Sequence, residues 1–128
     1  MKEPVWLSKA ALLIIHRQQM DLFGGPAGVR DEGLLDSALA RPVNLLEYGA
    51  ATLVEMAAAY AFGIVKNHPF LDGNKRTGFL SAALFLERNE IRIQADQGQV
   101  IASMLALAAG AIDEKGFAAW LADHTEAS

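Results

Sequence analysis

The chain contains no cysteine among its 128 residues. Disulfide bonds and thiolate metal sites are therefore excluded, and the composition suits a reducing compartment, so we expect a cytoplasmic protein. Aromatic residues are also few, at 8%, although 52% of the residues are hydrophobic. Alanine and leucine make up most of that hydrophobic fraction, which favours helices that pack closely.

Positive charge is scarce as well. Lysine and arginine number 11 against 15 aspartate and glutamate, which gives a formal net charge of −4 at pH 7. Binding to a nucleic-acid duplex requires a basic stripe on the protein surface. We therefore expect no nucleic-acid binding by this chain itself.

Long hydrophobic runs are missing too. The longest runs, residues 56–65 and 100–112, are shorter than the about 18–20 residues that span a bilayer. Residues 1–4 lack the hydrophobic segment of a signal peptide. We expect no membrane association and interpret both runs as buried helices.

The length suits one domain with one core, residues 1–128. Capping residues and apolar periodicity predict an all-α fold, a compact bundle of about six helices. The expected helices are residues 9–19, 32–40, 53–67, 74–88, 97–109 and 114–123, capped by Ser8, Asp31, Thr52, Asp72, Asp96 and Asp113. Pro42 is expected to end the second helix, with one further turn over residues 44–48.

Two of these segments, residues 53–67 and 74–88, are apolar on nearly all sides, which places them in the middle of a bundle. Glu55 and Tyr60 are exceptions, the first facing solvent and the second needing a hydrogen-bond partner. Residues 91–93 are expected to be extended but unpaired, and residues 122–128 form a polar tail. His16 and His124 are interpreted as structural or incidental.

Between the two central segments lies the signature segment, residues 68–78, His-Pro-Phe-Leu-Asp-Gly-Asn-Lys-Arg-Thr-Gly. Pro69 stops the preceding helix near Asn67 and favours an extended His68. The next helix then opens with free backbone N–H groups and two cations, Lys75 and Arg76, which together make an anion site.

The chemistry of this segment suits a polyphosphate. Gly73, Asn74, Lys75 and Arg76 are candidate phosphate-binding residues, and Asp72 is a candidate ligand of Mg²⁺, which takes few carboxylates plus substrate oxygens. His68 is the group here that takes a proton near neutral pH, and so the candidate catalytic base. Phe70 is interpreted as an apolar anchor. Each feature alone is more often an ordinary loop or solvated charge; it is their combination that indicates a site.

The signature segment resembles that of the Fic/Doc family, in which His-Pro-Phe is followed by an acidic residue, Gly-Asn-Gly-Arg and a second arginine. It is closest to the Doc branch, the death-on-curing toxins of type II toxin–antitoxin pairs, with Lys75 at the second glycine position. Phe79 stands where the second arginine would be. Residues 29–39 are similar to a segment near the start of Doc-like chains. The resemblance implies a Fic/Doc-type helical bundle and a short β-like flap over the site, for which residues 21–30 are the candidate.

The resemblance further implies a toxin-type protein kinase that moves the γ-phosphate of ATP to a Ser or Thr hydroxyl of a translation factor, elongation factor Tu in that family. Typical Fic members instead move AMP, and the residues alone do not decide between the two transfers. A non-catalytic nucleotide- or peptide-binding module is a third alternative, against which the intact His68, Asp72, Asn74 and Arg76 argue.

Doc-like toxins are neutralised by a Phd-like antitoxin whose C-terminal segment folds into a groove near the site. No segment of this chain matches the family's own inhibitory helix, with its Ser/Thr-x-x-x-Glu pattern. The resemblance therefore implies inhibition by a separate cognate antitoxin.

Overall fold

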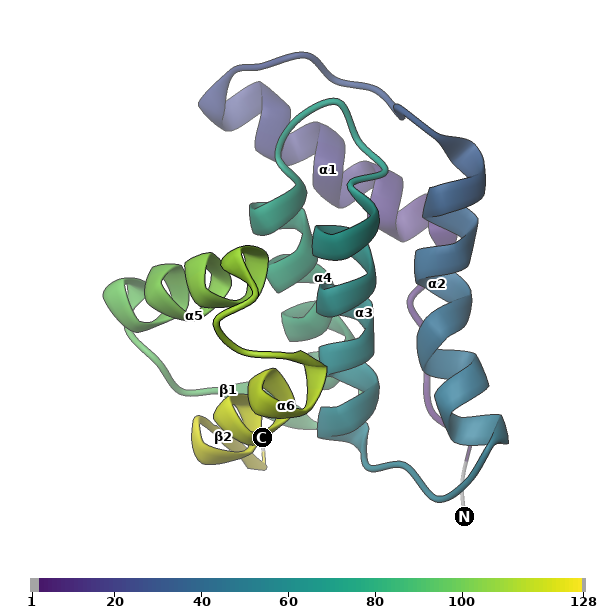
Figure 1. Ribbon diagram of the computed structural model, residues 1–128, viewed down its shortest axis with the longest axis vertical. Helices are drawn as coiled ribbons and strands as arrows, with labels where there is room; N and C mark the ends of the chain where they lie inside the picture. The colour runs from purple at the N-terminus through teal and green to yellow at the C-terminus, as the bar shows by residue number, and fades with distance from the viewer. Residues whose placement is uncertain (1–2, 128) are drawn as a thin grey trace.

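The computed structural model describes residues 3–127 and arranges them as a helical bundle (Figure 1). The elements in chain order are α1 (Lys9–Phe23), α2 (Glu32–Glu47), α3 (Leu53–Asn67), α4 (Asn74–Arg88), β1 (Ile91–Ile93), α5 (Gln97–Ala109), α6 (Glu114–Asp123) and β2 (Thr125–Ala127). The predicted all-α class is confirmed, since the described residues form six helices and only one small two-stranded sheet.

Local capping chemistry sets most of the helix starts. Each of five predicted caps accepts a hydrogen bond from the backbone N–H three residues ahead: Ser8, Asp31, Thr52, Asp96 and Asp113. At α3, Glu55 bonds back to the N–H of Thr52 and completes a capping box. The bounds of α3, α4, α5 and α6 agree with the sequence prediction, whereas α1 continues one turn further, to Phe23.

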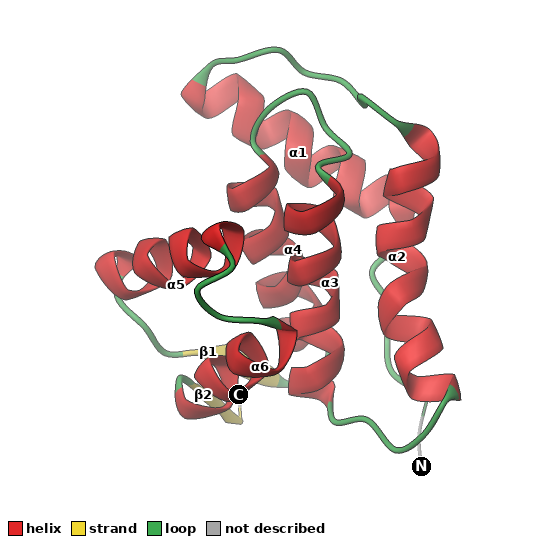
Figure 2. Ribbon diagram, viewed as in Figure 1, coloured by secondary structure: helices red, strands yellow, loops and turns green. Residues whose placement is uncertain are grey.

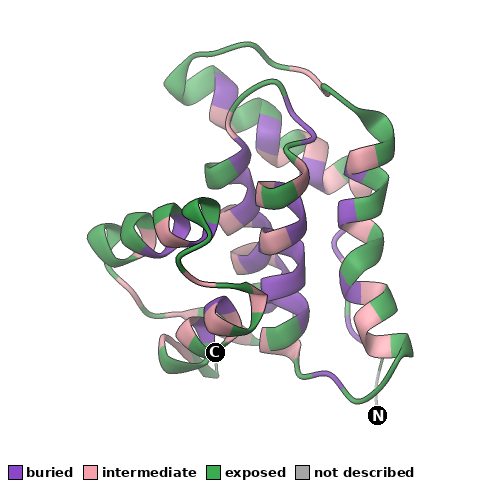
Figure 3. Ribbon diagram, in the orientation of Figure 1, coloured by how far each residue is buried: buried purple, intermediate pink, exposed green. Residues whose placement is uncertain are grey.

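Helix α3 occupies the middle of the bundle and packs against α2, α4 and α6 (Figure 1). Most of it is buried, while α2 and α5 show exposed outer faces (Figure 3). This confirms the interior position that its apolar composition predicts. The signature segment therefore leaves the most deeply buried helix of the molecule and enters its neighbour α4.

Glycines bring α3 close to both neighbours. A Cβ built on Gly63 would lie 3.1 Å from the Cα of Ala38 in α2, and one built on Gly78 in α4 would lie 3.1 Å from Cγ2 of Val65. Both distances are tighter than ordinary van der Waals contact. Larger side chains at these positions would push the helices apart and open the corner that carries the signature segment.

Helix α2 runs through Pro42 without ending there, so the predicted break at this proline is wrong. A proline inside a helix removes one hydrogen bond and costs about 3 kcal/mol. Pro42 is buried, however, and Ala38, four residues earlier, packs directly against Gly63. Burial of this face against α3 outweighs the lost bond, a compensation between helices that local sequence does not reveal.

The C-terminal residues are not a free polar tail, which is a second correction. Residues 91–93 pair antiparallel with residues 125–127, Arg92 opposite Glu126 (Figure 2). His124 precedes this strand; its Nδ1 lies 2.7 Å from the carbonyl oxygen of Trp120, on whose ring it stacks. Pairing satisfies backbone groups of a segment that composition marked only as extended. Ser128 lies outside the described residues.

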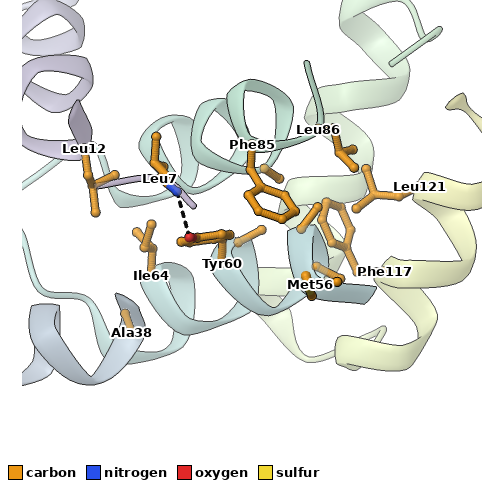
Figure 4. Packing of buried hydrophobic residues seen from close by; sticks show 14 of the residues in the cluster. Leu7, Leu12, Ala38, Met56, Tyr60, Ile64, Phe85, Leu86, Phe117 and Leu121 are labelled. Atoms are coloured by element: carbon orange, nitrogen blue, oxygen red, sulfur yellow. Dashed lines mark hydrogen bonds between the residues drawn. The ribbon is translucent and has the colours of Figure 1, made fainter. Parts of the chain in front are cut away.

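Tyr60 joins the N-terminal segment to the core. Its ring packs among Phe85, Ile64 and Met56, and its hydroxyl oxygen accepts a hydrogen bond of 3.0 Å from the N–H of Leu7 (Figure 4). The predicted partner for this hydroxyl is thereby found. Burial raises the pKa of Tyr60 above its ordinary value, because the charged phenolate would lose hydration.

Among residues 3–127, no helix combines the length and the apolar character required to cross a membrane.

Replacement of Tyr60 by phenylalanine should lower the free energy of unfolding by about 1–2 kcal/mol, because the buried N–H of Leu7 loses its acceptor. Urea unfolding followed by circular dichroism would measure this change. Tyr48→Phe is the matched control, since Tyr48 is 92% exposed and should tolerate the change. Equal stability of the two variants would contradict a structural role for the Tyr60 hydroxyl.

Candidate active site

His68 is the residue at which α3 ends. Its backbone is left-handed, with φ 53° and ψ 54°, and its N–H donates to the carbonyl oxygen of Ile64 at 3.0 Å. The extended geometry expected before Pro69 is therefore wrong: a left-handed residue closes the helix and satisfies a terminal carbonyl. The side chain of His68 is exposed and lines a cavity, so the imidazole stands outside the core.

Arg30, from the connector between α1 and α2, holds the end of α3. Its Nε donates to the carbonyl oxygen of His68 at 2.8 Å and its Nη2 donates to that of Asn67 at 3.0 Å. A guanidinium at a helix C-terminus also complements the helix dipole. Sequence reasoning gave Arg30 no role, because its partners lie 37 and 38 residues further along the chain.

The same connector pairs with the signature segment. Val29 and Phe70 form an isolated antiparallel bridge, and the N–H of Leu71 donates to the carbonyl oxygen of Gly28 at 3.1 Å. In Figure 1 the connector and the loop between α3 and α4 lie together at the top of the view. Of the predicted flap, residues 21–30, the first three belong to α1, and residues 24–30 form an irregular connector and not a hairpin. The role of this connector as a flap stays a prediction.

Phe70 is the anchor that the sequence predicted, with a completely buried side chain. Its N–H donates to Oδ1 of Asn74 at 3.1 Å, and its carbonyl oxygen accepts from Nδ2 of Asn74 at 3.0 Å. Its ring stacks on the ring of His16, with centroids 3.8 Å apart. The main chain and side chain of Phe70 are therefore both held.

Asn74 has a different position from the one its predicted role suggested. The side-chain amide is buried and makes both hydrogen bonds to the main chain of Phe70. Its oxygen and nitrogen thus close the loop, and any contact of Asn74 with phosphate would come from its backbone N–H. The sequence contains the amide but gives no sign of its partner.

Asp72 is not the cap of α4, contrary to the prediction. The N-cap is Gly73, whose φ of 77° is left-handed, and no side chain caps the helix. Oδ1 of Asp72 instead accepts from the N–H of Gly73 at 2.8 Å. Because Gly73 occupies the N-cap position, Asp72 lies one residue before the helix start. Its carboxylate is exposed and lines the cavity.

The environment of Asp72 fits a magnesium ion held with the substrate. A Cβ built on Gly25 would lie 2.7 Å from Oδ2 of Asp72, so a larger residue at position 25 would collide with this oxygen. Within residues 3–127 there is no cluster of three or more histidine, aspartate or glutamate side chains that could enclose a metal. Mg²⁺ commonly takes one or two carboxylates and completes its shell with phosphate oxygens and water, which is the donor set available here.

The first turn of α4 offers cations and backbone donors together. Its N–H groups have no carbonyl one turn earlier to bond, and the first helical bond is from Thr77 to Gly73. Lys75 and Arg76 are exposed on this turn, and the guanidinium of Arg76 lies 4.1 Å from the ring centre of Phe23. The stack orients Arg76 while leaving its N–H groups free for an anion.

These groups open into one cavity of about 880 Å³. Its ionisable lining residues are His68, Asp72, Lys75 and Arg76. Its apolar wall comes from α1, α3, α4 and α5: Leu22, Phe23, Val65, Phe79, Leu80, Val100, Ile101, Met104, Leu105 and Ala108. The structure thus brings the predicted catalytic, metal-binding and phosphate-binding residues to one opening, apart from the inward-turned amide of Asn74.

Replacement of Asn74 by alanine should lower the free energy of unfolding by about 2–3 kcal/mol, because the buried N–H and C=O of Phe70 lose their partners. Lys75→Ala, at the neighbouring exposed position, should change it by no more than about 0.5 kcal/mol. Thermal and urea unfolding of both variants would test this. An Asn74→Ala protein as stable as the wild type would contradict a structural role for the side-chain amide of Asn74.

The sequence of this chain is similar to those of known proteins. A sequence model described as the Fic/DOC family matches residues 6–86. The chain is 44% identical over 77 residues to a protein named Toxin Doc from Mycolicibacterium smegmatis, a match that covers 58% of each chain. It is 33% identical over 88 residues to one named Protein kinase doc from Escherichia phage P1, covering 68% of this chain and 70% of the phage protein.

The family match runs from before α1 into the last turn of α4 and contains the whole signature segment, together with the connector and the helix face that hold it. The chain therefore belongs to the Fic/Doc family.

Proposed function

We propose that this protein is a Doc-type toxin that acts as a protein kinase. It transfers the γ-phosphate of ATP to a Ser or Thr hydroxyl of a translation factor, for which elongation factor Tu is the first candidate, and thereby inhibits translation. The observation that carries the proposal is the convergence of an exposed imidazole, an exposed carboxylate and a cationic helix start on one cavity: His68, Asp72, Lys75 and Arg76.

In this mechanism His68 accepts the proton of the incoming hydroxyl as its oxygen attacks the γ-phosphorus. The new O–P bond forms while the bond to the β-phosphate oxygen breaks, and ADP leaves. Lys75, Arg76 and the N–H groups of the first turn of α4 stabilise the charge on the transferring phosphate. Mg²⁺ bound at Asp72 would neutralise the phosphate oxygens. The protein contributes position and electrostatics, which supply most of the catalysis in this reaction class.

Two features favour γ-phosphate transfer over AMP transfer. One relative, from phage P1, bears the name Protein kinase doc. The other is Phe79, which lines the cavity where the second arginine of AMP-transferring members would stand. Lys75 adds a cation to the first turn instead. The positive charge is thereby concentrated on one helical turn.

The apolar wall of the cavity is the candidate site for a Phd-like antitoxin. Leu22, Phe23, Ile101 and Leu105 are large apolar side chains that are mostly exposed although they line the cavity. An amphipathic segment that folds on binding would cover such a surface. The name of the mycobacterial relative, Toxin Doc, supports a toxin–antitoxin pair for this chain too.

Purified protein, Mg²⁺ and elongation factor Tu should yield a product that retains label from the γ-position of ATP. His68→Ala should slow this transfer by about 10²–10⁴-fold, the usual effect of a positioned base, without loss of stability because the side chain is exposed. Mass spectrometry of the product would show a gain of one phosphate. His124→Ala, a histidine remote from the cavity, is the control.

Other outcomes of that assay distinguish the alternatives. Label retained only from the α-position, with a gain of one AMP, would make the protein an AMP transferase. Absence of label from both positions, in elongation factor Tu and in a cell extract, would refute the kinase hypothesis and favour a non-catalytic binding module.

Replacement of Leu105 by aspartate should weaken binding of the C-terminal segment of the cognate antitoxin by at least about tenfold, since a buried unpaired charge is costly. Ala102→Asp is the matched control, because Ala102 is exposed on α5 and does not line the cavity. Calorimetry with a synthetic peptide would measure both affinities. Equal affinities of the two variants for the peptide would show that the antitoxin segment does not bind at the apolar wall.

A further inference from the structure

His16 is a buried polar side chain that the proposed mechanism does not use. It lies in the middle of α1 with 3% of its surface exposed. Its Nε2 lies 2.8 Å from the carbonyl oxygen of Asp72, 56 residues further along the chain. Its ring is nearly parallel to that of Phe70, at an interplanar angle of 9°. One side chain thus contacts both the anchor and the metal-ligand candidate of the signature segment.

The hydrogen bond identifies the proton on this ring. A carbonyl oxygen can only accept, so Nε2 of His16 must carry hydrogen and donate it to Asp72. An apolar side chain of similar size would fill the same space against Phe70 but would leave the carbonyl of Asp72 without this donor. The ring nitrogen of His16 is therefore needed for the hydrogen bond to Asp72 and not for the packing of α1.

The bond restrains the peptide group that joins Asp72 to Gly73. Its carbonyl oxygen accepts from His16, while its N–H, that of Gly73, donates to the carboxylate of Asp72. Since that carbonyl and that N–H belong to one peptide plane, holding one orients the other. Oδ1 is then held by the N–H of Gly73, while Oδ2 lies next to Gly25.

The next turn of α1 fits the same loop. A Cβ built on Gly73 would lie 2.3 Å from Cε of Met20, so this methyl group packs directly against the glycine. The left-handed φ of 77° at Gly73 also disfavours any residue with a side chain. His16 and Met20 are one helical turn apart, so they form one continuous face against residues 70–73. This face of α1 therefore packs against the loop that carries Asp72.

We propose that His16 is a positioning residue, which donates a hydrogen bond to the carbonyl of Asp72 and so orients the Asp72 carboxylate for a divalent cation. The inference deepens the proposed function and rests on it for its catalytic consequence. The hydrogen bond itself can be tested without substrate.

The test compares His16→Gln with His16→Met. The two side chains have nearly equal length and neither preserves the ring stack, but only glutamine retains an N–H donor near the position of Nε2. The methionine variant should need about tenfold more Mg²⁺ for half-maximal phosphate transfer, the usual loss when the support of a metal ligand is removed. The glutamine variant should stay closer to the wild type than to the methionine variant.

A second readout is independent of activity. Nitrogen-15 NMR of the protein without nucleotide should show the Nε2–H tautomer for His16. Amide exchange of Gly73 should be faster in His16→Met than in His16→Gln. If the methionine variant does not fold, His16→Phe replaces it, because it retains a ring against Phe70 and lacks the donor.

His124→Phe is the control for loss of a stacked histidine. His124 also stacks on an aromatic ring and bonds to a backbone carbonyl, but at the far end of α6. It should change neither the Mg²⁺ requirement nor the exchange of Gly73. A wild-type protein that transfers no phosphate would refute the proposed function. The amide exchange rates of Gly73 in the two variants would still test the role of His16. Equal behaviour of the glutamine variant and the donor-lacking variant in both readouts would overturn the positioning role.

Discussion

The pair of hydrogen bonds between the side chain of Asn74 and the main chain of Phe70 is the constraint on which the site depends. An amide side chain presents one donor and one acceptor, and so does the backbone of a single residue; here they satisfy each other across one turn. Both groups are buried, so water cannot substitute for either bond. His68 and Asp72 each lie two residues from Phe70, so their positions follow from this clamp.

Three other contacts brace the clamped loop from separate elements. Arg30 holds the carbonyl of His68, Val29 forms a bridge to Phe70, and His16 holds the carbonyl of Asp72. None of these residues belongs to the signature segment. A site needs an accuracy of about 0.5 Å to place a reacting group, and a loop of this length achieves that only when its backbone groups are bonded on several sides. The family match begins at residue 6, which places all three supports within it.

Sequence patterns predicted the features whose causes are local. The caps at Ser8, Thr52 and Asp96 act on N–H groups three residues away, and the position of α3 follows from its own apolar composition. The features that were missed need a partner from another element. Pro42 is tolerated because Ala38 meets Gly63, and residues 125–127 form a strand because residues 91–93 lie beside them.

The signature segment shows the same division within a few residues. Its composition predicted an anion site at a helix start, and the structure places the relevant groups at one cavity. Composition did not predict which of its polar side chains turn inward. Asn74 and Thr77 are buried, whereas His68, Asp72, Lys75 and Arg76 are exposed. The direction in which each side chain points depends on the left-handed backbone at His68 and Gly73. It therefore also depends on Met20, which packs against Gly73 from a distant part of the chain.

The distribution of charge along α4 bears on which phosphate reacts. Lys75 and Arg76 occupy its first turn beside the loop that carries His68, and the next turn presents Phe79 and Leu80 to the cavity. The β- and γ-phosphates carry most of the charge of ATP, and they are stabilised only where cations and N–H groups stand. Delivery of AMP would bring the α-phosphorus to His68 and direct the more charged phosphates toward side chains without charge. In the proposed kinase reaction, delivery of the γ-phosphate would place the most charged end of the nucleotide at the cationic turn. The apolar wall would then remain for the nucleoside or for a partner, so the departures at positions 75 and 79 both fit the proposal.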